Sequence, residues 1–180
     1  MNNQHSQGST RELGTGEWIL MIAEALCFIA QVAVCTLAYN TLGATWLIAL
    51  GWVSFVAALL LGWRARLAFE THGGAPETES WLRTRNVVTA DVYGLIRHPM
   101  YLSFALISVT LVLFSQHWLN VALGAVFVGL VVNDMRREEQ GNLDKFGDAY
   151  RDYMQRVPRM NILAGVIRAM RARKPAEPPL

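Results

Sequence analysis

The side chains best suited to chemistry lie in two short stretches, Arg-His-Pro at 97–99 and Glu-Glu at 138–139. We expect Pro99 in the first turn of a helix, where its missing N–H group costs no hydrogen bond. Arg97 and His98 then stand beside free backbone N–H groups, an arrangement that attracts a carboxylate or a phosphate. The acid pair suits a cationic ligand or a metal. From the residues alone two plainer interpretations stay open, an interfacial anchor for the first stretch and a solvated helix for the second.

Other kinds of site lack their sequence patterns. The chain has four scattered histidines and only two cysteines, with no HExxH or Cys/His quartet, so we expect no metal site. It has no nucleophile elbow, no GxGxxG motif and no Walker motif. The net charge of +2 is too small to indicate a nucleic-acid partner. These absences leave the Arg-His-Pro and Glu-Glu stretches as the candidate site, with their plainer interpretations still open.

The elements that must position these residues are apolar helices. Hydrophobic residues make up 53% of the 180 and charged residues 17%, against roughly 25% charged in an average soluble domain. This composition excludes a disordered, collagen-like or disulfide-rich chain. Four windows, 18–39, 45–63, 99–114 and 118–132, contain a single charged residue, Glu24. Because about 20 apolar residues cross a bilayer as a helix, the sequence predicts an all-α integral membrane protein with about four transmembrane helices.

The basic residues predict how the chain sits in the membrane. All 16 Lys and Arg residues lie before the first window, between the second and third, or after the fourth. The positive-inside rule therefore predicts a multi-pass protein with cytoplasmic N- and C-termini. Apolar residues at helical spacing from Leu143 to Val157 predict a cytoplasmic amphipathic helix, against the membrane or closing over the bundle. The expected divisions are a flexible N-terminus (1–15), two transmembrane helices (16–63), a cytoplasmic loop (64–98), a helical hairpin with the C-terminal region (99–159) and a basic tail (160–180).

In their order along the chain, the motifs resemble those of one family. They are Val-Val-Thr-x-x-x-Tyr at 87–93, Arg-His-Pro-Met-Tyr at 97–101, Glu-Glu at 138–139, Phe-Gly-x-x-Tyr-x-x-Tyr at 146–153 and Val-Pro-Arg at 157–159. This pattern is similar to the isoprenylcysteine carboxyl methyltransferase family, which belongs with the membrane phospholipid methyltransferases. The resemblance implies a helical enzyme that uses S-adenosyl-L-methionine, held at the cytoplasmic end of the last spans. It also implies a lipophilic methyl acceptor reached through the membrane lipids.

Carried over position by position, the resemblance implies a set of site residues. Those expected to bind the cofactor are Arg85, Asn86, Val87, Val88, Tyr93, Arg97, His98, Pro99, Met100, Tyr101 and Glu138. Those expected to be catalytic are Arg137 and Glu139. A helix start suits the carboxylate of the cofactor, and an acid suits its ammonium group or ribose hydroxyls. The two tyrosines offer aromatic faces to its adenine or its sulfonium.

Three features depart from the family pattern, one of them the absence of a proline that usually follows soon after Val-Pro-Arg. Asp134 stands where relatives usually carry an arginine that holds the acceptor carboxylate, and Asp91 replaces a usual glycine. Because a helix turns about 100° per residue, neither Arg136 nor Arg137 points in the same direction as residue 134. An acid there repels a carboxylate, so we expect an amine or a neutral acceptor. Two other functions stay open, an NADPH-dependent membrane reductase of the sterol-reductase type and a non-catalytic membrane protein that retains the fold.

Overall fold

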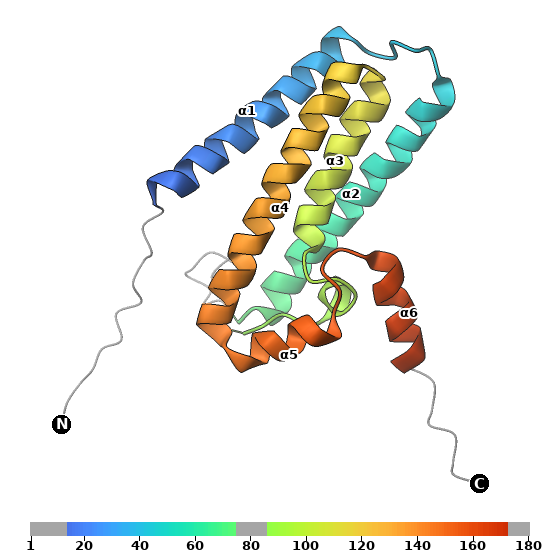
Figure 1. Ribbon diagram of the computed structural model, residues 1–180. Coiled ribbons are helices and arrows are strands. Elements are labelled where there is room, and N and C mark those ends of the chain that lie inside the picture. The colour runs from blue at the N-terminus through green and yellow to red at the C-terminus, as the bar shows by residue number, and fades with distance from the viewer. Residues whose placement is uncertain (1–13, 75–85, 173–180) are drawn as a thin grey trace, which may run out of the picture.

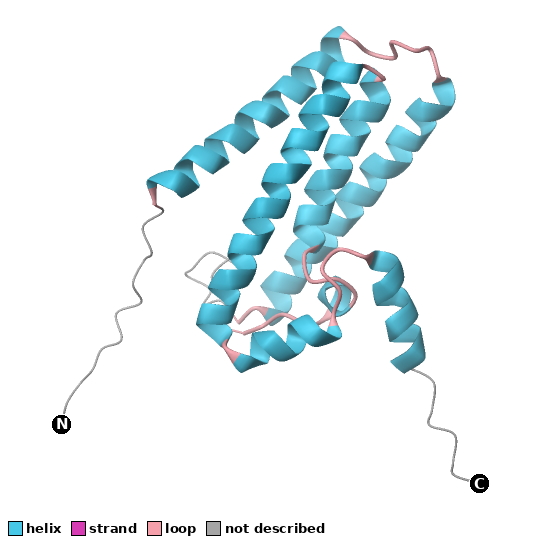
Figure 2. Cartoon of the chain, viewed as in Figure 1, coloured by secondary structure: helices cyan, strands magenta, loops and turns pink. Residues whose placement is uncertain are grey.

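The computed structural model describes residues 14–74 and 86–172, which fold into helices joined by loops (Figure 1). These residues contain no strand (Figure 2), so the predicted all-α class is confirmed for them. In chain order the helices are α1 (Thr15–Leu37), α2 (Thr45–His72), the 3-10 helix η1 (Asp91–Gly94), α3 (Pro99–Ser115), α4 (Trp118–Phe146), α5 (Asp148–Arg156) and α6 (Ile162–Ala172).

Three helices, α1, α2 and α4, are long and apolar enough to cross a membrane. The fourth predicted span, α3, is apolar but has only 17 residues. Only 11% of the most apolar stretch of α1 is buried inside the protein, and the same share holds for α2. Apolar surface on this scale is covered by lipid rather than by water in stable proteins. The helices therefore indicate a membrane protein.

Small residues allow α2 to pack closely against α3. Gly51, Ala58 and Ala65 recur every seven residues on α2, and all three are buried. A Cβ atom at Gly51 would lie 2.5 Å from the Phe114 ring. Small side chains at helix interfaces bring backbones together where no hydrophobic effect drives association. On the other side of α3, α1 packs against α3 and α4 and diverges from them toward its N-terminus (Figure 1).

Two boundaries differ from the sequence-based expectation. The loop predicted to begin at residue 64 begins later, because α2 continues to His72. The reason is burial, since Ala65 and Ala68 pack in one cluster with Val88 and Tyr93. Within the segment predicted only as a basic tail, residues 162–172 form α6.

The C-terminal apolar stripe closes over one end of the bundle. Gly147 has a φ of 55° and separates α4 from α5, which turns across the bundle end in Figure 1. This left-handed conformation suits glycine, which has no Cβ. Tyr150, Tyr153 and Val157 then form one buried cluster. The sequence predicted that this stripe lies against the membrane or closes over the bundle, and in the structure it closes over the bundle.

Candidate functional site

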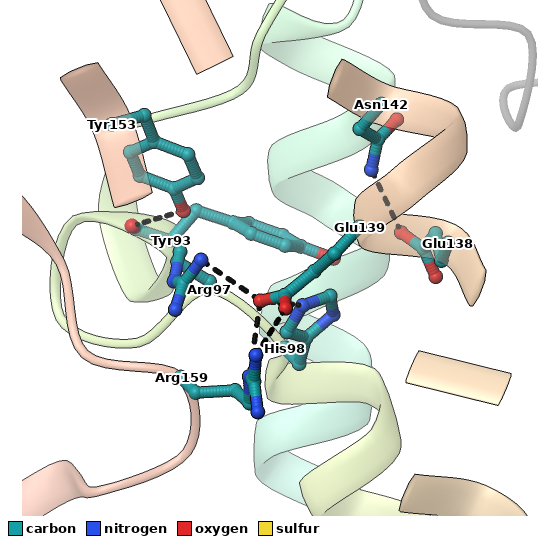
Figure 3. A network of polar contacts seen from close by, with 8 residues as sticks. All are labelled: Tyr93, Arg97, His98, Glu138, Glu139, Asn142, Tyr153 and Arg159. Carbon is teal, nitrogen blue, oxygen red and sulfur yellow. Dashed lines mark hydrogen bonds and ion pairs between the residues drawn. The ribbon is translucent and has the colours of Figure 1, made fainter. Parts of the chain in front are cut away.

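Three of the predicted motifs meet around one buried carboxylate, that of Glu139 on α4 (Figure 3). Its side chain is only 5% exposed and lies 2.8 Å from Arg97 Nη1. His98 Nε2 lies 3.1 Å from Glu139 Oε1. The Arg159 guanidinium donates hydrogen bonds to both carboxylate oxygens, with Nε 3.2 Å from Oε1. Glu139 therefore ties the start of α3 to the Val-Pro-Arg turn after α5.

Backbone hydrogen bonds hold the same two segments together. The Arg97 N–H group donates to the carbonyl oxygens of Pro158 and Arg159, at 3.0 and 3.1 Å. The His98 N–H group donates to the Arg159 carbonyl at 3.1 Å. Pro99 follows as the first residue of α3, as predicted. The Val-Pro-Arg motif thus fixes the backbone that carries Arg97 and His98.

The cluster retains a surplus of positive charge. Two guanidinium groups, those of Arg97 and Arg159, face the single carboxylate of Glu139. Burial lowers the pKa of His98, against the opposing effect of nearby carboxylates, so its imidazole is neutral near pH 7. Arg97 is 8% exposed in its side chain, and its Nε atom has no hydrogen-bond partner among the described residues. An anionic group is the ligand that would complete this environment.

A cavity of about 1000 Å³ extends from this cluster between α1, α3 and α4. Of the predicted cofactor-binding residues, Arg85 lies outside the described residues, and Pro99 is buried without lining the cavity. Those that line it are Asn86, Val87, Val88, Tyr93, Arg97, His98, Met100, Tyr101 and Glu138. The structure therefore brings nearly the whole predicted set to one cavity.

Aromatic and polar side chains shape the cavity end beside α5. Tyr93 is 5% exposed and packs edge-on against Phe69, with ring centroids 4.8 Å apart. The Tyr153 hydroxyl donates to the Tyr93 carbonyl at 2.7 Å, which ties α5 to η1 (Figure 3). Burial raises the pKa of both phenols, so they stay neutral. These residues offer a flat, uncharged surface to a ligand.

Glu138 presents a carboxylate at this end of the cavity. It is exposed, and it accepts a hydrogen bond from Asn142 Nδ2 at 3.4 Å. Asn142 lines the cavity but was not predicted as a site residue. Asn142 lies four residues after Glu138, one turn farther along the same helix, and this spacing could have identified it as a site residue from the sequence.

The rest of the cavity is mainly apolar. Its lining here comes from three helices and comprises Met21, Ala25, Phe28, Phe104, Ile107, Phe127 and Val131. Two acids, Glu24 of α1 and Asp134 of α4, also line it and are close enough to interact electrostatically. Glu24 Oε1 is buried and has no hydrogen-bond partner within the part of the chain that the structure describes. A cationic group placed between these acids would balance their charge.

The two residues predicted to be catalytic do not line the cavity. Arg137 is exposed on α4, and Glu139 is buried among its cationic partners. Glu139 therefore acts structurally on Arg97 and His98, and its catalytic role, like that of Arg137, stays a prediction.

Comparison of the chain with protein-family models, curated proteins and solved structures gives no match. What the site can bind follows from its residues. One end combines surplus positive charge with the carboxylate of Glu138, which suits a zwitterion. The other end suits a lipophilic molecule that carries a polar or cationic group.

Proposed function

We propose that the protein is a membrane methyltransferase that uses S-adenosyl-L-methionine and acts on a lipophilic small-molecule or lipid acceptor. The observation that supports this function best is a single cavity of about 1000 Å³ that joins the predicted cofactor residues to an apolar region between the long helices. Ligand pockets commonly measure about 300–1,000 Å³. The volume is enough for the cofactor together with the reacting end of an acceptor.

The residues at the α5 end fit the chemical groups of the cofactor. Its carboxylate suits the positive surplus beside Arg97, whose Nε atom lacks a partner in residues 14–74 and 86–172, and the N-terminus of α3. Its ammonium group suits the carboxylate of Glu138. Tyr93 and Tyr101 offer aromatic faces to adenine or to the positively charged sulfur. When bound, the cofactor supplies an electrophilic methyl group on that sulfur.

The protein contributes position and environment to the reaction. Methyl transfer from a sulfonium needs the acceptor nucleophile held in line at about 3 Å, and such positioning removes much of the barrier. Arg97 and Glu138 orient the cofactor from the α5 end of the cavity. Phe28, Phe104 and Phe127 line the acceptor part and exclude water from it.

The acids in the apolar part favour an amine or a neutral acceptor over a carboxylate. Asp134 stands where the family that the motifs resemble usually carries an arginine for an acceptor carboxylate, and Glu24 lines the same part of the cavity. An acid in place of the arginine repels an acceptor carboxylate at close range, and in a partly dehydrated site this repulsion strongly disfavours a carboxylate substrate. We therefore place a prenylcysteine carboxylate last among the acceptor classes.

The proposed arrangement in the membrane puts the α5 end of the cavity at the cytoplasm. The N-terminal segment, residues 64–98 and the C-terminal region carry all the Lys and Arg residues, as the positive-inside rule requires of one cytoplasmic face. In this arrangement α3 is the fourth span and forms a hairpin with α4. Cofactor then enters from the cytoplasm and acceptor from the lipid.

Transfer of a radiolabelled methyl group tests the function and the acceptor class together. The purified protein is incubated with labelled S-adenosyl-L-methionine and a prenylcysteine, a lipid amine or a hydrophobic thiol. We expect saturable labelling of the amine or the thiol, and Asp134→Asn should reduce labelling of the amine more than that of the thiol. Labelling of the prenylcysteine alone would contradict the acceptor proposal. Absence of transfer to every class, together with no binding of the cofactor, would contradict the function itself.

A further inference from the structure

Helix α6 turns its apolar face away from the rest of the protein. Leu163 is 71% exposed and Met170 is 66% exposed, although both are large apolar residues. Val166 lies between them on the same face, at spacings of three and four residues, and is also exposed. An amphipathic helix of a water-soluble protein directs this face into its core. The exposed face of α6 therefore calls for a partner outside the described protein.

The opposite edge of α6 is attached to the loop that leads into α3. A Cβ atom at Gly165 would lie 2.1 Å from the Leu95 carbonyl oxygen, so only glycine permits the observed approach. Arg168 Nη2 donates a hydrogen bond to the Gly94 carbonyl at 2.7 Å. Both contacts are on the side away from Leu163. They hold α6 in place while its apolar face stays free.

These contacts also place α6 at the end of the bundle where an apolar helix begins. Gly94 and Leu95 come only a few residues before Pro99, the first residue of α3. Figure 1 shows α6 beside this end of the bundle and apart from α4. Trp63, in the part of α2 toward its C-terminal end, is 61% exposed, and tryptophan prefers the boundary between lipid and water. The apolar face of α6 therefore lies near the expected membrane surface.

The charges of α6 select the kind of partner. Residues 162–172 contain Arg168 and Arg171 and no acidic residue, and Arg173 and Lys174 follow in the sequence. Two copies of α6 facing each other would bring arginines together without an acid on either helix to neutralise them. The headgroups of acidic phospholipids supply the missing negative charge, and the adjoining acyl chains cover apolar side chains.

We propose that α6 is an interfacial anchor: Leu163, Val166 and Met170 insert into the boundary layer of the bilayer, and Arg171 contacts acidic headgroups. This anchor would hold the Arg97–His98 loop and the cavity end at a fixed depth, because α6 is attached directly before α3. The inference concerns the membrane surface and does not depend on methyl transfer.

Spin labels on single cysteines test the anchor. Leu163→Cys and Met170→Cys probe the apolar face, and Ala164→Cys is the matched control on the exposed polar flank of the same helix. Cys27 and Cys35, both buried and unpaired, are replaced by alanine in every variant. The full chain is placed in vesicles of phosphatidylcholine and phosphatidylglycerol. Collision of each label with oxygen, which concentrates in lipid, is compared with collision with a water-soluble nickel chelate.

We expect the ratio of oxygen to chelate collisions to be several-fold higher at residues 163 and 170 than at 164. Removing phosphatidylglycerol should lower the ratio at the first two positions. Equally low ratios at all three positions would overturn the anchor, because the apolar face would then lie in water. Low collision rates with both reagents at 163 and 170, together with disulfide cross-linking between chains, would instead show a second copy covering the face. A ratio that does not respond to phosphatidylglycerol would overturn the contact with acidic headgroups.

Discussion

Glu138 and Glu139 are neighbours with the same chemistry, yet the structure predicts opposite results when each is changed to glutamine. Glu139 is 5% exposed in its side chain and pairs with Arg97, which is 8% exposed, and with Arg159, which is 41% exposed. Glu138 is exposed and lines the cavity. Glu139→Gln should therefore affect stability first, and Glu138→Gln should affect ligand binding alone.

The size of the stability loss follows from which partner stays buried. Removing one member of a buried ion pair costs about 3–5 kcal/mol, because the other charge is left without compensation. Arg159 can turn toward water and adds little, since exposed pairs contribute about 0–1 kcal/mol. Glutamine keeps one acceptor oxygen for Arg97, so we expect the low end, about 3 kcal/mol. For a chain of this size that corresponds to a fall in the melting temperature of about 6–12 °C.

Thermal unfolding of the detergent-solubilised protein, followed by circular dichroism, measures this difference. Glu139→Gln should melt about 6–12 °C below the wild type, and Glu138→Gln should melt close to it. Binding of S-adenosylhomocysteine should weaken about ten- to a hundred-fold in Glu138→Gln, as expected for a lost charge-assisted hydrogen bond. Equal melting temperatures for the wild type and Glu139→Gln would refute the assignment of Glu139 as the centre of the buried cluster.

Other consequences concern titration, packing and topology. Because burial lowers the pKa of His98 in the folded protein, the unfolded chain binds its proton more tightly. The free energy of unfolding should therefore be highest above about pH 6.5 and decrease as the pH falls below it. Denaturant midpoints measured at several pH values should show this decrease in the wild type and a smaller decrease in His98→Gln. Tyr153→Phe removes the 2.7 Å hydrogen bond to the buried Tyr93 carbonyl and should lower the free energy of unfolding by about 1–3 kcal/mol. An unchanged melting curve would contradict this prediction. Cysteines at Leu42 and Asp152, both exposed and at opposite ends of the bundle, should react with an impermeant reagent from opposite sides of the membrane; labelling of both from one side would contradict the proposed topology.

The apolar helices and the convergence of the motifs were predictable from the sequence for definite reasons. Long windows without charge have few alternatives to a membrane helix, and a helix continuing past residue 132 places Asp134 and Glu138 on one face. Both residues line the cavity, as that spacing requires. Asp91 stands where the resembled family usually has glycine, and its φ of 54° lies in the region that favours glycine. Asp tolerates this conformation, and here its carboxylate pairs with Arg64 at 2.7 Å.

Other features depend on contacts between distant segments and were not predictable. Local sequence does not show that Arg159 and Arg97 share the carboxylate of Glu139, since the two arginines are brought together by the turn after α5. The extension of α2 to His72 depends on burial against Tyr93, which lies beyond the intervening loop. Helix α6 is short and held by the approach of Gly165 to Leu95. Composition alone described that segment as a basic tail.

Calorimetric titration of the purified protein with S-adenosylhomocysteine, and separately with NADPH, tests the proposed function most directly. We predict saturable binding of S-adenosylhomocysteine, weakened in Glu138→Gln, and no binding of NADPH. An exposed acid outside the cavity, changed in Asp152→Asn, provides the matched control and should leave the affinity unchanged. Saturable binding of NADPH without binding of S-adenosylhomocysteine would favour a reductase, and binding of neither would contradict a cofactor site in this cavity.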